Sequence, residues 1–498
     1  MHLKTNSPAV AHHGKTVIGF NWIGGKELEG DLPSFDAKSA VDSRDTVGIF
    51  PECGERDLEK AARAAAAGFK AWSAFSAQAR AEVIGRIGAA LAEHQAIIAA
   101  VITREVGKPP REALAEVREA IEICRTFQSG TPQAEPGGRR RPLGVCAVLA
   151  GNSSPLAASC GQLIPALAHG NSVVWKPSVN APTTAYLLIR CMMDAGLAPG
   201  AMNVVNGKGR AGCGKFFVAG LDKGFYQRFS FTGSAAVGRA IGELAGRNLV
   251  PASLELGGPN PMIVMPDCDL DRAVAGALEG AFRCAGQLRG ALTNLILHRD
   301  VAGPFKDRFL AAVEAMTVGN PVSDPEVFYG PMINARFARS FEEHWAAGRQ
   351  DGAALLCGGA RWTDENRTGR VLGCIIKGFY MQACVWDGVT PEMGLFRTEL
   401  FGPSVNLCTV DSFDQALEWA GLSRGPASQL HTGNRAWAER FKRESAADLC
   451  VVNGAAGDEP AANGFTRWQA VRDDGPDAQA PEAGPCAFHY DISHWDGF

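Results

Sequence analysis

The sequence lacks any apolar run long enough to cross a membrane, and it lacks the cysteine and histidine patterns of a metal site or a disulfide framework. Its 14 cysteines are scattered singly without a C-x-x-C pair, and no histidines are paired at metal-ligand spacing. We therefore expect reduced thiols that act mostly as small core residues, and no metal. The amino terminus, MHLKTNSPAVAHHGKT, has no apolar segment of signal-peptide length, so the expected location is cytoplasmic.

A strong charge of one sign is also missing. The formal net charge is -4 over 498 residues, which gives no electrostatic reason to expect nucleic acid or an anionic membrane as a partner. The three arginines at 139–141 form too short a run to change this, and they are expected at a solvated edge. Apolar residues make up 46% of the chain and charged residues 20%, as in soluble globular enzymes, and the length predicts two or three domains.

The hydrophobic pattern predicts an α/β protein. Residues 56–129 carry Ala, Leu and Ile at three- and four-residue spacing, which predicts helices, one of them ending at Gly107 and Pro109. From 142 to 246, buried apolar runs alternate with helical patterns. This alternation predicts a mostly parallel, doubly wound sheet with ligands at the carboxyl ends of its strands. A second α/β unit is expected to about Asn453, with the boundary near Leu256.

Five short strings then point to one family. They are VVWKPS at 173–178, FTGS at 231–234, ELGGPNP at 255–261, GAFRCAGQLRGALTN at 280–294 and TELFGP at 398–403. In order and spacing the chain resembles the aldehyde dehydrogenase superfamily from about Trp22 to about Asn453. The resemblance implies a Rossmann-type cofactor domain (1–129 and 142–255) and an α/β catalytic domain (256–453). It implies NAD(P)-dependent oxidation of an aldehyde to a carboxylate, and the texture is nearest to members acting on small semialdehydes.

The position of the family's catalytic cysteine is the main departure. In the family this cysteine follows the Gly-Gln turn after one residue, and here that position is Arg289. Arginine stays protonated and offers no lone pair, so it cannot replace the thiolate as nucleophile. Cys284 is the nearest thiol, but it would need the loop to be rebuilt. We therefore expect classical aldehyde oxidation to be lost or impaired, as in a pseudoenzyme.

Two catalytic positions remain by resemblance. Asn152 matches the family's oxyanion donor, although Gly151 and Ser153 replace bulky aromatic residues, and a simple turn-forming asparagine is the alternative. Glu255 matches the general base. Since the cysteine and this glutamate face each other in the family, Arg289 is expected to form an ion pair with Glu255, which would lower the pKa of that carboxyl group.

The adenosine side of a cofactor site is expected around VVWKPS. Lys176 ends a buried strand, where a cation is costly unless it meets a polar ligand. The resemblance implies that it contacts the adenosine ribose or a 2′-phosphate, with Ser178 in the same site; a lysine leaving the sheet for solvent is the alternative. Val179 stands where NAD-preferring members have a glutamate for both ribose hydroxyls, so NADP is at least as well suited as NAD.

The pyrophosphate and nicotinamide sides are expected at two other strings. Gly233 and Ser234 precede a helix, where the serine serves either as an N-cap alone or beside a pyrophosphate bound to the same N–H groups. Glu399 and Phe401 match the positions that hold the second ribose and pack the nicotinamide ring. A carboxylate accepts from both ribose hydroxyls at once, whereas an ordinary exposed glutamate and a core phenylalanine are the alternative.

The family's oligomerisation arm is expected to be reduced. Residues 130–141 leave room for little more than a turn, and 454–498 is expected to be irregular apart from AFHYDISHW, which alternates as a strand does. Whether a homo- or hetero-oligomer forms is left open.

Three functions stay open at this stage. One is a silent dinucleotide-binding partner or regulatory protein. Another is an enzyme of altered chemistry, in which Arg289 binds the carboxylate or phosphate of a small molecule. The third is a conventional dehydrogenase that uses another cysteine on a small aldehyde.

Overall fold

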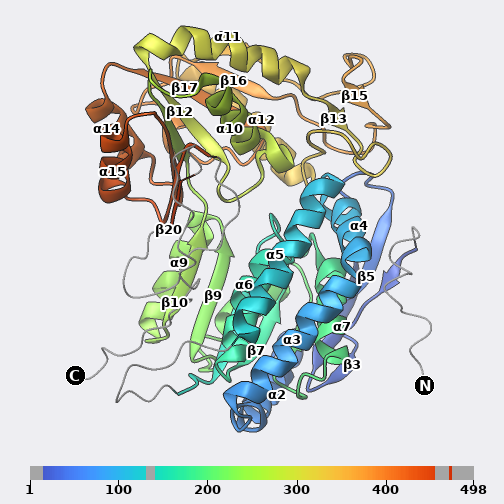
Figure 1. Cartoon of the computed structure of the whole chain (residues 1–498). Helices are drawn as coiled ribbons and strands as arrows, with labels where there is room; N and C mark the ends of the chain where they lie inside the picture. Colours follow the sequence, from blue (N-terminus) through green and yellow to red (C-terminus); the bar gives the residue numbers. More distant parts are fainter. Residues whose placement is uncertain (1–14, 130–140, 455–469, 474–498) are drawn as a thin grey trace. The chain divides into compact units, whose positions relative to one another are not determined.

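The computed structural model describes residues 15–129, 141–454 and 470–473. The chain divides into two compact units, Met1–Leu256 and Gly257–Phe498, each with its own hydrophobic core. Figure 1 labels helices and strands of both units.

The first unit contains a seven-stranded sheet in the order β10-β9-β6-β7-β8-β2-β3. The strands β6 to β10 pair in parallel, and the β2–β3 hairpin adds two antiparallel strands at one edge. The order reverses between β6 and β9, and such a switch point opens a crevice for ligands at the carboxyl ends of the strands. The bounds are β2 Asn21–Ile23, β3 Lys26–Leu28, β6 Val145–Leu149, β7 Ser172–Lys176, β8 Met202–Val204, β9 Arg228–Gly233 and β10 Ala252–Leu256.

Helices cover this sheet, and Figure 1 shows α3 and α5 side by side. As predicted, one helix ends at Gly107, because this residue adopts a left-handed conformation that other residues adopt at a cost. The helical pattern before it is interrupted at His94, where α3 ends and α4 begins. The bounds are α2 Glu55–Ser73, α3 Ala77–Glu93, α4 Gln95–Val106, α5 Pro110–Gln128, α6 Ala157–Ala168, α7 Pro182–Asp194, α8 Cys213–Ala219 and α9 Ala235–Arg247.

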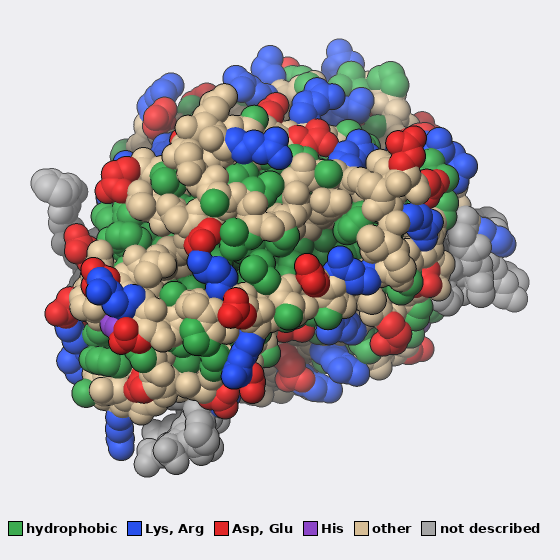
Figure 2. Space-filling model, turned by 90° about the horizontal axis from the view of Figure 1, so that it is seen from above, with side chains coloured by type: hydrophobic (Ala, Val, Ile, Leu, Met, Phe, Trp, Pro, Cys, Tyr) green, Lys and Arg blue, Asp and Glu red, His purple; other side chains and the backbone are tan. Residues whose placement is uncertain are grey.

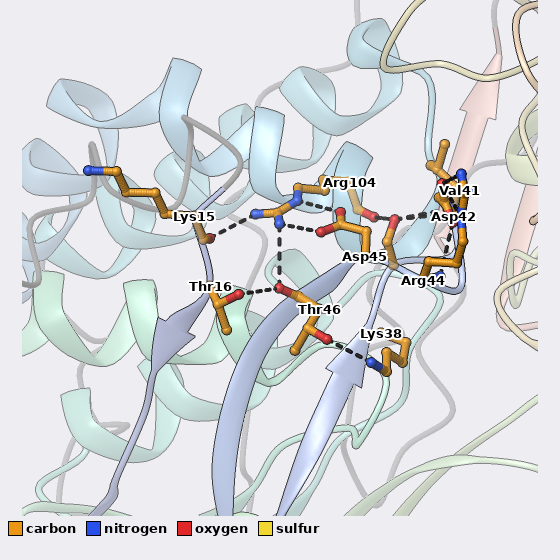
Figure 3. A network of polar contacts seen from close by, with 10 residues as sticks. Lys15, Thr16, Lys38, Val41, Asp42, Arg44, Asp45, Thr46 and Arg104 are labelled. Atoms are coloured by element: carbon orange, nitrogen blue, oxygen red, sulfur yellow. Dashed lines mark hydrogen bonds and ion pairs between the residues drawn. The ribbon is translucent and has the colours of Figure 1, made fainter.

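A second, three-stranded sheet in this unit has the order β1-β5-β4, from β1 Val17–Ile18, β5 Thr46–Glu52 and β4 Leu32–Lys38. Arg104 of α4 joins it to the helices. Its guanidinium donates to both oxygens of Asp45, at 2.6 and 2.7 Å, and to the carbonyl of Lys15 at 3.1 Å (Figure 3). Paired donors in a mostly buried fork of this kind stabilise the join between sheet and helix.

The second unit is built on an eight-stranded sheet in the order β14-β16-β17-β12-β11-β18-β19-β20. All neighbours pair in parallel except β14 with β16. The bounds are β11 Asn260–Val264, β12 Leu292–His298, β14 Ala354–Cys357, β16 Cys384–Asp387, β17 Ser404–Val410, β18 Ala427–His431, β19 Leu449–Val452 and β20 Ala470–Asp473, and a separate pair joins β13 Val318–Gly319 to β15 Val371–Leu372.

The helices of the second unit alternate with these strands. Phe282 of α10 stacks on Phe309 of α11, with ring centroids 6.1 Å apart. The bounds are α10 Leu270–Phe282, η1 Arg283–Gly286, α11 Arg299–Ala315, α12 Ala335–Gln350, α13 Gly394–Arg397, α14 Phe413–Ser423 and α15 Arg435–Glu444. The predicted α/β class with mostly parallel sheets is therefore confirmed.

One prediction about the carboxyl end is wrong in part. The segment 454–498 was expected to be irregular up to its last residues, yet β20 lies in it and pairs in parallel with β19. A strand can form there because the main chain of β19 supplies its hydrogen bonds, whatever the composition around it. The expected turn at 130–141 lies, except for Arg141, outside the described residues, as does AFHYDISHW.

The surface shows no dominant charge on the face drawn in Figure 2, where acidic and basic side chains are interspersed. No helix of the described ranges is long and apolar enough to cross a membrane. Within those same ranges, no group of three or more His, Cys, Asp and Glu side chains is placed to hold a metal ion.

Candidate functional site

The switch point of the first sheet carries the Asn152 turn. This turn follows β6, and Ala150 N donates to Lys176 O at the end of β7 over 3.2 Å. Gly151 lies against Thr232 of β9, where an added methyl group would be 3.2 Å from the threonine Cγ2. The register pairs Thr232 with Glu255 of β10. Asn152 and Glu255, both half-buried, are thus brought to the same end of the sheet.

A buried ion pair contacts the segment that follows the Asn152 turn. Lys108 Nζ lies 2.7 Å from Glu116 Oε2 and donates to Ser154 Oγ over 3.3 Å. The other oxygen of Glu116 accepts from the N–H groups of Leu156 and Ala157, at 2.7 and 3.3 Å, where α6 begins. Glu116 therefore caps α6 from another helix and fixes the segment that follows Asn152.

Lys176 ends β7 inside the protein. Its side chain is buried, and Nζ donates to Pro177 O at 3.0 Å. Burial lowers the pKa of the Lys176 ammonium group, because desolvation disfavours its charge, and the nearby Cys213, Glu52 and Cys53 oppose this shift. The alternative of a lysine that leaves the sheet for solvent is thereby excluded.

Ser178 and Ser234 stand at two chain turns. Ser178 is half-buried and its Oγ accepts from Asn180 N at 3.2 Å. Ser234 occupies the N-cap position of α9, directly after Gly233 at the end of β9, yet within the described residues its side chain makes no capping hydrogen bond. An N-cap role alone does not account for this serine, and its expected place beside a pyrophosphate stays a prediction.

A glycine-rich loop of the first unit was missed. Gly207, Gly209 and Gly212 form a G-x-G-x-x-G pattern between β8 and α8, the spacing that marks dinucleotide-binding turns and could have identified the loop. Its N–H groups, however, already hold an anion of the protein. Glu52 Oε1 accepts from Lys208 N at 3.0 Å and from Cys213 N at 2.8 Å.

In the second unit, the Gly-Gln turn has an unusual backbone. Cys284 and Ala285 have φ angles of 48° and 56°, in the left-handed region, and Gly286 follows with 66°. A methyl group at Gly286 would overlap Gly402 O, so only glycine fits there. The turn therefore packs directly against the TELFGP loop.

Gln287 fixes this turn with its buried side chain. Its Nε2 donates to Cys284 O at 3.0 Å and to Pro331 O at 3.2 Å, while its Oε1 accepts from Ile333 N at 3.0 Å. These three partners are main-chain atoms, so the glutamine side chain joins the Gly-Gln turn to the loop that contains Pro331 and Ile333.

Asn260 holds the main chain at Arg289. Its buried Nδ2 donates to the carbonyls of Arg289 and Ala291, at 3.0 and 2.8 Å, and its Oδ1 accepts from Ala427 N at 2.9 Å. The Arg289 side chain is half-buried. One amide from the ELGGPNP string thus fixes the peptide groups that follow Arg289 and Ala291, and neither bond involves the side chain at 289.

Glu399 and Phe401 lie beside the same turn. The Glu399 carboxylate occupies the space in which a side chain at Gly257 would lie, which explains this glycine of ELGGPNP. Phe401 has a φ angle of 39°, and its ring centroid is 5.2 Å from that of Phe337. The two rings are tilted by 38°, and the Arg336 guanidinium lies 4.7 Å from the Phe337 ring centroid, within cation–π distance.

Buried asparagine side chains hold the segment just before Glu399, and no sequence pattern revealed them. Asn406 Nδ2 donates to Asn294 Oδ1 at 2.9 Å and to Leu395 O at 3.0 Å, and Asn294 Nδ2 donates to Phe396 O at 3.0 Å. These bonds join β12, which follows the Gly-Gln turn, to the segment that leads into Glu399.

The expected site residues are therefore grouped within each unit. Each unit brings its own members together at one set of loops, and the predicted ion pair between Arg289 and Glu255, which would join the two units, stays a prediction. The first unit holds Asn152, Lys176, Ser178, Gly233, Ser234 and Glu255, and the second holds Arg289, Glu399 and Phe401.

Comparisons with known proteins identify the family of the chain. The sequence model of the aldehyde dehydrogenase family matches residues 30–468. An α-ketoglutaric semialdehyde dehydrogenase of Bacillus subtilis is 31% identical over 451 residues, covering 88% of both chains. A betaine aldehyde dehydrogenase of Mesorhizobium japonicum is 31% identical over 421 residues, covering 82% of this chain and 84% of its own.

Solved structures show the same architecture. A 3,6-anhydro-L-galactose dehydrogenase in complex with NAP superposes with a TM-score of 0.80 at 28% identity, covering 89% of this chain and 93% of its own. Aldehyde dehydrogenase C of Pseudomonas syringae, as a cysteine-to-alanine variant with NAD+ and octanal, superposes with a TM-score of 0.82 at 29% identity, covering 89% and 90%. With its five strings, its two α/β units and these matches, the chain belongs to the aldehyde dehydrogenase family.

Proposed function

We propose that this member of the family binds NAD or NADP and does not oxidise aldehydes by the thiolate route. The observation that carries the proposal is residue 289. It follows a Gly-Gln turn whose main chain is held by Gln287 and Asn260, yet its side chain is a guanidinium. If this turn carries the family's nucleophile position, the guanidinium there cannot attack a carbonyl carbon.

The other requirements of the family reaction are met by candidate residues. Aldehyde oxidation needs a nucleophile, donors for the oxyanion, a bound hydride acceptor and a base. In this proposal Asn152 would donate to the oxyanion and Glu255 would accept a proton. Cys284 does not supply the missing thiolate in this proposal, because its side chain is 6% exposed and its carbonyl is bonded to Gln287.

Binding of a dinucleotide is supported by the first unit. Lys176 is a buried cation at the carboxyl edge of the sheet, and Ser234 begins α9 at the switch strand β9. When bound, the nicotinamide group would supply the hydride acceptor. On the second unit, Glu399 would accept from ribose hydroxyls and Phe401 would pack on the ring.

Relatives support separable binding and chemistry. The aldehyde dehydrogenase C variant, in which a cysteine is replaced by alanine, still holds NAD+ and octanal. By analogy, a chain with arginine at position 289 retains a place for a dinucleotide and for a small aldehyde or carboxylate. A half-buried guanidinium on a fixed main chain favours the carboxylate, since arginine pairs with it through two parallel hydrogen bonds.

The test is a comparison of wild type, Arg289→Cys and Arg289→Ala. NADH and NADPH formation is followed with a panel of small aldehydes, and dinucleotide binding is measured by calorimetry. We expect all three to bind a dinucleotide and only Arg289→Cys to turn over, because alanine removes the guanidinium without supplying a thiolate.

Three outcomes would count against the proposal. Turnover by the wild type overturns the loss of thiolate chemistry. Absence of dinucleotide binding in the wild type overturns the binding function. Binding without turnover in all three proteins contradicts the assignment of the loss to position 289 alone.

A further inference from the structure

The glycine-rich loop at 207–212 is wound around a carboxylate. Glu52 comes from the end of β5 and is 6% exposed. Its two oxygens each lie 3.0 Å from Lys208 N, and Oε1 also lies 2.8 Å from Cys213 N. A methyl group added at Gly207 would be 2.6 Å from Oε1, and one at Gly212 would overlap the same atom. The carboxylate therefore leaves room only for glycine at positions 207 and 212, whereas a side chain at Gly209 would meet no atom within 4 Å.

This contact changes what the loop can do. In dinucleotide-binding turns with the same spacing, the N–H groups face a pyrophosphate. Here the N–H groups of Lys208 in the loop and of Cys213 directly after it donate to Glu52, so these two groups do not face a pyrophosphate. The conformation of the loop is instead fixed within the protein, by Glu52 and by the hydrogen bond from Cys53 N to Asn206 O at 2.9 Å.

The negative charge of Glu52 also favours the charged form of the buried Lys176, since it opposes the lowering of the ammonium pKa by burial. The charged and titratable groups that act on the Lys176 ammonium are Cys213 of α8, Glu52 at the end of β5 and Cys53 directly after it. The neighbouring Cys213 thiol and burial raise the pKa of Cys53, whose Sγ donates to Gly54 O over 3.1 Å, so Cys53 stays neutral. Glu52 is thus the carboxylate that opposes the desolvation of Lys176.

We propose that Glu52 is a positioning residue of the dinucleotide site, which holds the 207–213 loop and the Lys176 ammonium group in one fixed arrangement for the adenosine end of the cofactor. This inference rests on the proposed dinucleotide binding. Glu52 does not touch the cofactor in it. The carboxylate acts through the loop, by two backbone N–H groups, and through Lys176, by its charge.

The test is calorimetric binding of NAD+ and NADP+ to wild type and Glu52→Gln, from neutral to alkaline pH. In Glu52→Gln one oxygen can still accept at the place of Oε1, but an NH2 group would replace Oε2 against Lys208 N, and the side chain carries no charge. We expect Kd to rise by about tenfold or more, the size that follows from losing charge-assisted hydrogen bonds that organise a site.

The pH profile separates positioning from simple destabilisation. Affinity is expected to fall with rising pH as Lys176 loses its proton. Without Glu52 the pKa of Lys176 drops further, so the fall moves to lower pH in Glu52→Gln. In Lys176→Met this pH dependence should disappear.

A matched control is available in the same unit. Glu105 is also a buried carboxylate, and it accepts from Thr183 N at 2.7 Å and from Thr184 N at 2.9 Å. Since it does not act on Lys176, Glu105→Gln should lower the unfolding temperature and leave the Kd and its pH profile unchanged. If Glu52→Gln does not fold, Gly212→Ala displaces the carboxylate while keeping its charge, and it should raise Kd as well.

The outcomes separate this inference from the proposed function. A wild-type Kd and pH profile in Glu52→Gln, or tighter binding, overturns the role of Glu52 while leaving dinucleotide binding intact. Equal loss of affinity in Glu105→Gln and Glu52→Gln, with no change of pH profile, also overturns it. If the wild type binds no dinucleotide, both the function and the inference fall.

Discussion

The buried pair of Lys108 and Glu116 offers the most direct test of how the Asn152 turn is held. The two side chains are 7% and 3% exposed, and their charged atoms lie 2.7 Å apart. Glu116 also accepts from Leu156 N and Ala157 N. We expect Lys108→Met and Glu116→Gln each to destabilise the first unit, because each leaves a buried partner without its opposite charge.

The two losses should differ in size. Breaking a buried pair costs about 3–5 kcal/mol. In Lys108→Met the Glu116 carboxylate keeps its two backbone N–H donors, so we expect the loss of stability to lie near the lower value. Glu116→Gln also weakens the cap of α6, which places it near the upper value. At about 2–4 °C per kcal/mol for a unit of this length, the expected losses are about 6–12 °C and 10–20 °C.

The double variant decides whether the two residues act as a pair. Lys108→Met combined with Glu116→Gln leaves no uncompensated charge, so its loss should be about 2 kcal/mol smaller than the sum of the single losses. Calorimetry gives the stabilities, and hydrogen exchange should rise at 150–157 in both single variants. Lys38→Met is the control. Lys38 Nζ lies 3.0 Å from Asp36 Oδ2, but the two side chains are 44% and 49% exposed, so this variant should lose less than about 1 kcal/mol of stability. Losses below about 1 kcal/mol at Lys108, or strictly additive losses, would show that the two residues do not act as a buried pair.

Two further predictions concern the Gly-Gln turn. In the native protein a maleimide should modify the exposed Cys374 and leave the buried Cys284 unmodified, as followed by mass spectrometry; rapid labelling of Cys284 would reopen it as a nucleophile. Ala285→Gly should stabilise the second unit by roughly 0.5–1 kcal/mol, because glycine removes the left-handed strain at φ 56°, whereas Ala281→Gly within α10 should destabilise it by about 1 kcal/mol. A lower unfolding temperature for Ala285→Gly would contradict the strain argument.

Local pattern was sufficient for much of the fold. The runs that became β6 and β7 were predictable as buried strands because both of their faces are covered, and Gly107 marked a helix end because its conformation favours glycine. The break at His94 was not predictable, since the helical spacing continues across it. The strand β20 was hidden for another reason: its bonds come from β19, which no local composition records.

The candidate site divides in the same way. The motif positions, including Arg289, could be named from the sequence because short strings carry them. Their supports could not, because Glu116, Gln287 and Asn260 act on main-chain groups far away in the sequence. Glu52 is the extreme case, since the glycine pattern of its loop predicts a phosphate partner and the actual partner is a carboxylate 156 residues from Lys208.

The hydrogen bonds of the Asn260 amide bear on which side chains residue 289 can carry. The bonds that shape the loop end on the carbonyls of residues 289 and 291, so they are indifferent to the side chain at 289. A substitution at 289 removes neither acceptor, because both are main-chain carbonyls. The two bonds from Asn260 therefore do not require a particular side chain at this position.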